Sequence, residues 1–119
     1  MAISPPHELL DLPDRGELVT RVTAWEEGPC QILVGKLREP KTVTCIRLHV
    51  PPEDKQTVPS YWDVTSTRLH VWLRVHLPVA VQERRWIRVQ KFGVAPRATF
   101  SAEIFPPGVG GPAFVGVRS

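Results

Sequence analysis

Arginine and tryptophan alternate most closely in residues 84–92, which read RRWIRVQKF. Trp86 and Arg88 share one face of the strand that this segment would form, because side chains alternate along a strand. A tryptophan ring can stack on a nucleic-acid base while a neighbouring arginine binds the phosphate. The pattern therefore predicts a surface for single-stranded nucleic acid. It equally fits a structural pair in which Arg88 covers Trp86 by a cation–π contact, and tryptophan in a small β domain often belongs to the core.

No catalytic signature accompanies this stretch. The chain lacks a Gly-x-Ser-x-Gly motif, a phosphate loop and a His-Glu-x-x-His motif. Cys30 and Cys45 form no Cys-x-x-Cys motif, and we expect two free thiols in a reducing cytosol, with a disulfide left open. The four histidines are scattered: His7, His49, His70 and His76. We therefore expect a non-catalytic protein without metal or cofactor.

Length and composition fit one domain. The chain has 119 residues, 42% of them hydrophobic, which suffices for one core. Its net charge is +3, with eleven arginines and four lysines. This preference for arginine favours phosphate binding, but a biased composition with 13 prolines and no asparagine explains it as well. No segment has the length and hydrophobicity of a membrane span or a leader peptide, so we expect a cytoplasmic protein without membrane contact.

Three strands are predicted in the first half of the chain. Residues 17–25, 31–38 and 42–50 alternate polar and apolar side chains. A turn at residues 26–29 and another at residues 38–40 would join them, with Gly35 as a bulge in the second strand. The proline-rich residues 51–60 form a loop.

A helix is predicted at residues 63–77, with Asp63 as its N-cap and Pro78 as its end. The competing interpretation is a strand, because leucine and valine also alternate from Leu69 to Val75. Two more strands follow at residues 84–92 and 98–105. The domain then covers residues 16–105, preceded by an extended lead-in (1–15), with Leu9, Leu10 and Leu12 docked on the body, and followed by a flexible Gly- and Pro-rich tail (106–119).

The order β-β-β-α-β-β resembles the OB-fold, a five-stranded, partly open barrel with its helix between the third and fourth strands. The resemblance covers residues 16–105 and is one of topology, without a family motif. It implies binding of single-stranded DNA or RNA on the face of the second and third strands and on the loops between strands one and two and between strands four and five. The implied binding residues are Arg21, Trp25, Lys36, Arg38, Arg47, His49, Trp86, Arg88, Lys91, Phe92 and Arg97.

Two other functions remain open. The chain could be a protein-interaction or assembly subunit that forms a homo-oligomer or a hetero-oligomer through exposed strand edges. A carbohydrate-binding module is the third possibility, because tryptophan also stacks on sugars. An excess of acidic groups near the tryptophans would favour it, and the sequence has the reverse.

Overall fold

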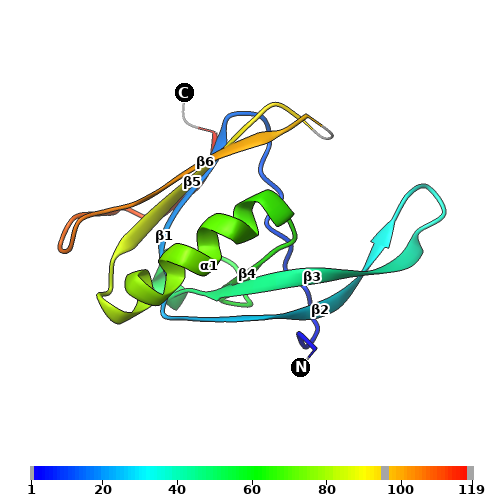
Figure 1. Cartoon of the computed structure of the whole chain (residues 1–119), viewed down its shortest axis with the longest axis horizontal. Coiled ribbons are helices and arrows are strands. Elements are labelled where there is room, and N and C mark those ends of the chain that lie inside the picture. The colour runs from blue at the N-terminus through cyan, green and yellow to red at the C-terminus, as the bar shows by residue number, and fades with distance from the viewer. Residues whose placement is uncertain (1, 95–96, 118–119) are drawn as a thin grey trace.

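The computed structural model describes residues 2–94 and 97–117, and these form a mainly β fold with one α-helix, as predicted. They form two antiparallel sheets, ordered β6-β5-β1-β7 and β2-β3-β4 (Figure 1). The prediction of a five-stranded barrel is wrong in its count and closure, because the described residues form seven strands in two sheets that do not close. The elements in chain order are β1 (Gly16–Arg21), β2 (Ala24–Val34), β3 (Glu39–His49), the 3-10 helix η1 (Pro52–Asp54), β4 (Tyr61–Val64), α1 (Thr67–Gln82), β5 (Trp86–Phe92), β6 (Thr99–Ile104) and β7 (Phe114–Val117).

The chain passes from one sheet to the other at Val22 and Thr23. Before this bend β1 pairs with β5 and β7, and after it β2 pairs with β3 along all of its residues. The turn predicted at residues 26–29 is therefore wrong, since these residues continue β2 opposite residues 44–47. Pro29 is tolerated there because β2 lies at the edge of its sheet, where one side of the strand needs no ladder hydrogen bond.

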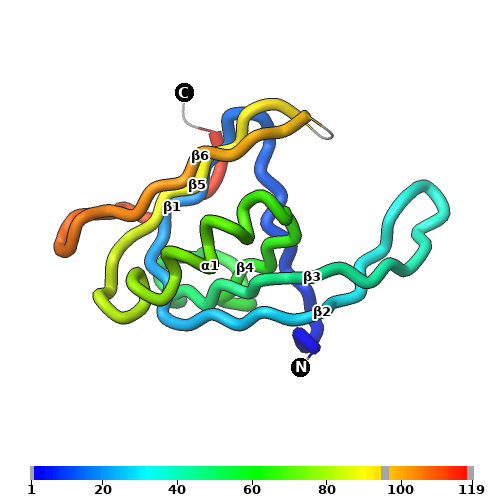
Figure 2. The backbone as a smooth tube through the Cα atoms, viewed as in Figure 1, coloured from blue at the N-terminus to red at the C-terminus, as the bar shows by residue number. Residues whose placement is uncertain are grey.

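The turn between β2 and β3 lies at residues 35–38, not at residues 38–40 as predicted. Gly35 opens it with a φ of 75° and Arg38 closes it with a φ of 55°. Glycine adopts this left-handed backbone without strain, so Gly35 makes the turn rather than a bulge. The resulting hairpin projects from the body of the molecule (Figure 2).

The helix begins and ends later than predicted. Asp63 belongs to β4, and the N-cap is Ser66, whose Oγ accepts a hydrogen bond from the Leu69 N–H at 3.3 Å. Pro78 lies inside α1 and is exposed, so its ring does not disturb packing and the helix continues to Gln82. The alternative of a strand in this region is wrong.

One core joins the two sheets and the helix, which lies between the sheets in Figure 1. The buried face of α1 recurs every three or four residues, as helical geometry requires. This face meets buried side chains from β1, β3 and β5. The fully buried large residues include Leu18, Ile46, Leu48, Leu73, Leu77 and Ile87.

Both terminal segments pack on the domain. Leu12 is buried and Leu10 half-buried against the core, as expected for the lead-in, while Leu9 stays exposed. The expectation of a flexible tail is wrong for the described part, because β7 pairs with β1 and the loop before it covers Trp86. Residues 118 and 119 of the predicted tail lie outside the described residues.

Candidate nucleic-acid interface

Arg47, predicted to bind phosphate, lies buried beneath the N-terminal segment. Its Nε donates to Asp63 Oδ1 at 2.7 Å and its Nη2 to Asp63 Oδ2 at 3.0 Å. Nη2 also donates to the Ser4 carbonyl at 2.7 Å, and the guanidinium lies 3.8 Å from the centroid of the Tyr61 ring. The hydrogen bonds to Asp63 raise the pKa of Arg47, so it stays charged. With its donors used inside the protein, Arg47 is not available to a phosphate.

Asp63 organises the segment that covers Arg47. Its carboxylate also accepts from the Glu8 N–H at 3.1 Å. Its backbone donates to the Glu8 carbonyl at 2.7 Å and accepts from the Leu10 N–H at 2.9 Å. The lead-in is thus hydrogen-bonded along the outer edge of β4. This explains the correction to the sequence prediction: the Asp63 carboxylate is committed to a long-range ion pair and does not cap the helix.

Arg21 and Trp86 face each other on the neighbouring strands β1 and β5 of one sheet. The Arg21 guanidinium lies 5.1 Å from the centroid of the Trp86 ring and donates to Asp54 at 2.6 Å. Burial raises the pKa of Asp54, but the hydrogen bonds from Arg21 outweigh this effect and lower the pKa overall. On the other side, Gly110 packs so closely that an added Cβ would lie 2.0 Å from the Trp86 ring. Trp86 is therefore covered and does not form an open stacking platform.

Three further predicted residues are also engaged within the fold. Arg88 donates to Glu17 at 2.8 Å, and these hydrogen bonds raise its pKa. Trp25 is half-buried and packs against the core. His49 lies 3.3 Å from a carboxylate oxygen of Glu26. The basic residues of the strands are thus largely used in stabilising the fold.

The cations without an ion pair gather in two places. Within the part of the chain that the structure describes, no carboxylate lies within ion-pair distance of eight basic side chains. One group surrounds the start of α1 and the loop after β5, and consists of Arg15, Arg68, Lys91 and Arg97. The other lies on the β2–β3 hairpin and consists of Lys36, Arg38 and Lys41. Arg84 stands apart at the other end of α1. In Figure 1 the β2–β3 hairpin projects on the side where α1 begins, away from the end of α1.

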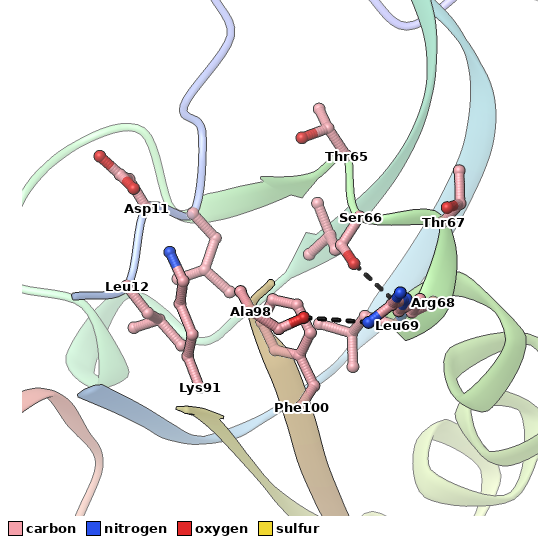
Figure 3. A pocket seen from close by; sticks show the side chains of 12 residues that line it. Asp11, Leu12, Thr65, Ser66, Thr67, Arg68, Leu69, Lys91, Ala98 and Phe100 are labelled. Carbon is pink, nitrogen blue, oxygen red and sulfur yellow. Dashed lines mark hydrogen bonds between the residues drawn. The ribbon is translucent and has the colours of Figure 1, made fainter. Parts of the chain in front are cut away.

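A cavity of about 470 Å³ lies within the first group (Figure 3). Lys91 from β5 and Arg68 from the first turn of α1 supply its positive charge, and Asp11 adds one carboxylate. Arg68 Nη1 donates to the Ala98 carbonyl at 3.1 Å, which fixes it beside β6. Other lining residues are the hydroxyl-bearing Thr65, Ser66 and Thr67 and the apolar Leu10, Leu12, Val64, Leu69 and Phe100.

The cavity combines an apolar floor with cations and hydroxyl groups at its rim. An aromatic or aliphatic floor accepts the face of a base, and cations with hydroxyl donors accept a phosphate. Neither Phe92, 42% exposed at the end of β5, nor Arg97, exposed before β6, lines the cavity. Phe92 follows Lys91 in β5, so its side chain lies on the opposite face of the sheet. The cavity thus places apolar surface, including the Phe100 ring, beside two cations and three hydroxyl groups.

Five of the predicted residues lie in this region or on the hairpin: Lys36, Arg38, Lys91, Phe92 and Arg97. Sequence reasoning missed Arg68 and Phe100. Phe100 alternates with polar residues along β6, and Arg68 lies exposed in the first turn of α1, so neither carries a local binding pattern. The cavity arises where four separate segments meet, and no local pattern carries that information.

No protein-family model matches the chain, and neither a curated protein nor a solved structure matches it. Among the described residues, no helix is long and apolar enough to cross a membrane. The same residues contain no cluster of three or more histidine, cysteine or acidic side chains that could hold a metal ion.

Proposed function

We propose that this protein is a non-catalytic binder of single-stranded nucleic acid. The observation that carries the proposal is the distribution of charge: the inner arginines are neutralised by carboxylates, whereas the unpaired Arg68 and Lys91 line a cavity with an apolar floor and further unpaired cations lie on the β2–β3 hairpin. Single strands are held without sequence preference by such a combination of cations along the backbone and apolar surface under the bases.

The order of the elements supports an OB-like arrangement. If β1 and β2 count as one bent strand, β1–β6 provide five strands with α1 between the third and the fourth. The turn at residues 35–38 is then the loop between strands one and two. The segment that contains Arg97, between β5 and β6, then joins strands four and five. These are the two loops that OB-folds use for single strands, and here they carry Lys36, Arg38 and Arg97.

The positions of the cations and the apolar residues in the cavity indicate how a single-stranded nucleic acid would lie. Lys91 and Arg68 would neutralise the phosphates next to a base seated over Leu69 and Phe100. A further nucleotide would stack on Phe92 where the nucleic acid passes over the end of β5 to the opposite face of the sheet. The nucleic acid would continue toward the β2–β3 hairpin with its Lys36, Arg38 and Lys41. The covered Trp86 takes no part in this binding.

A fluorescence anisotropy titration with a labelled oligothymidine at several salt concentrations tests the proposal. We expect binding that weakens with salt, because phosphate contacts release counterions. Arg97→Gln is expected to weaken binding and to reduce the slope of log affinity against log salt by about 0.7. Arg84→Gln is the matched control, since Arg84 is also an exposed, unpaired arginine in a turn but lies at the far end of α1.

Absence of binding at low salt would reject the proposal. So would equal losses in the Arg97 and Arg84 variants, because affinity would then follow net charge and not this site. Phe92→Ala tests the stacking contact, with an expected loss of about 1 to 3 kcal/mol of binding free energy.

A further inference from the structure

Beyond Pro29, no backbone hydrogen bond from the described residues reaches the outer edge of β2. β2 lies at the edge of its three-stranded sheet and pairs only with β3 among the described strands. In the described part of the N-terminal segment, one backbone hydrogen bond reaches this edge: the Ile3 N–H donates to the Pro29 carbonyl at 2.9 Å. Because backbone groups alternate sides along an antiparallel strand, Gln31 and Leu33 direct their N–H and C=O groups to the same outer side as Pro29. The register to β3 is continuous, so this alternation is unbroken.

This edge lacks the features that normally protect an exposed strand. Residues 30–34 read CQILV, with no charge, no proline and no glycine. The facing part of β3 carries Glu39, Pro40 and Lys41, which are the charges and the proline that prevent strand addition. Leu33 is 52% exposed and Leu37, in the turn, 82%. The hairpin is thus protected on one edge and open on the other.

The charges along β2 and the turn after it are complementary to those of a second, antiparallel copy of the same segment. Glu26 and Glu27 lie near the start of β2, the uncharged residues 30–34 follow, and Lys36 and Arg38 come directly after the strand. An antiparallel pairing of two identical strands places the basic end of each beside the acidic end of the other. The carboxylates already bind within the chain, Glu27 to Arg74, but both keep exposed surface.

We propose that the chain forms a two-fold dimer in which residues 30–34 of β2 pair antiparallel with residues 30–34 of a second copy. Gln31 of one copy then faces Leu33 of the other, and Ile32 faces its own equivalent on the two-fold axis. Both outward-facing residues of each strand find hydrogen-bond partners. The two hairpins merge into one continuous sheet. The dimer does not depend on nucleic-acid binding, because neither Gln31 nor Ile32 belongs to the cavity or the basic loops.

Sedimentation of the full chain over a hundredfold range of concentration tests the dimer, because mass action shifts it toward monomer on dilution. Gln31→Pro removes an N–H that points outward from the free edge, and it leaves all hydrogen bonds to β3 intact. This variant should therefore be monomeric at every concentration. Thr42→Pro is the matched control: Thr42 pairs directly with Gln31, and its N–H faces the opposite edge of the hairpin. This control should dimerise like the wild type.

A wild type that is monomeric throughout would overturn the proposal, and so would a dimer that survives Gln31→Pro or is lost equally in Thr42→Pro. Circular dichroism and urea unfolding of each variant show whether its hairpin remains folded. If Gln31→Pro fails to fold, Ile32→Cys replaces it. Directly opposed residues that share no hydrogen bonds lie close enough for a disulfide. Mild oxidation should therefore crosslink Ile32→Cys but not Thr42→Cys. Failure of this crosslink would exclude the proposed register.

Discussion

Arg47 and Asp63 form an ion pair from which water is excluded, with side chains 6% and 0% exposed. Forming such a pair costs desolvation, and the two hydrogen bonds between the partners offset that cost only while both are present. The N-terminal segment depends on the same pair, because Arg47 and Asp63 bind its backbone at Ser4 and Glu8. At the scale of single residues, this pair stabilises the N-terminal segment over β3 and β4.

Arg47→Met is therefore expected to lower the free energy of unfolding by about 3 to 5 kcal/mol, because the Asp63 carboxylate would remain buried without its cation. Urea unfolding measures the loss, and limited proteolysis should show faster cleavage before residue 10. Arg74→Met serves as the comparison, since it removes the more exposed pair with Glu27 and should change stability far less. Equal losses in the two variants would contradict the role given to Arg47.

Trp86 is covered by the loop that precedes β7. Gly110→Ala would place a methyl group 2.0 Å from the indole, so the ring or the loop must move. We expect a loss of about 1 to 3 kcal/mol in unfolding free energy and greater quenching of tryptophan fluorescence by iodide. Gly108→Ala lies in the same loop with open space around its Cβ, and should strain the backbone without exposing the ring. Unchanged quenching in Gly110→Ala would mean that Trp86 is already open.

At the scale of elements, the sequence predicted correctly the strands that have a clear local pattern of alternating polar and apolar residues. The alternating residues of β3, β5 and β6 predicted these strands to within three residues at each end. The prediction placed a turn within β2 because its Glu-Glu-Gly-Pro segment has the composition of a turn. This segment can be part of a strand because β2 lies at the edge of its sheet. β7 was missed because its pairing with β1 links opposite ends of the domain. The cavity was missed for the same reason: its walls come from segments far apart in the sequence.

Pro78 is the local signal that misled the prediction of α1. It lacks the N–H that would bond to the carbonyl of Arg74, yet its exposed ring meets no packed neighbour and the helix continues. Pro78→Ala restores this hydrogen bond, but it also gives the unfolded chain more conformational freedom, which opposes folding. The net effect should be an increase of about 1 to 2 kcal/mol in the free energy of unfolding. Urea unfolding measures it. A decrease would mean that the proline ring itself packs favourably.

At the scale of the whole molecule, no described strand of one sheet is paired with a strand of the other. Side-chain contacts between the sheets therefore matter for stability. Part of this contact is the apolar core around α1. Another part is polar: Arg21, at the end of β1, binds Asp54 of η1, which follows β3. The Arg21 backbone N–H also donates to Asp54 at 3.2 Å. Asp54 thus connects one sheet to the segment that follows the other.

This connection makes stability depend on pH. The pKa of Asp54 is lowered in the folded protein, so its contribution is complete above the unfolded pKa of about 3.9 and is lost as pH falls through the folded value. Asp54→Asn should cost about 1 to 2 kcal/mol at pH 7, and the difference from wild type should shrink toward zero at the acid end of that window. Urea unfolding at pH 7 and in acid measures both values. Glu103→Gln, which removes a carboxylate 53% exposed and 3.4 Å from Arg88, should show a smaller loss at pH 7. A cost of Asp54→Asn that stays constant across this range would show that the side chain contributes by packing and not by its charge.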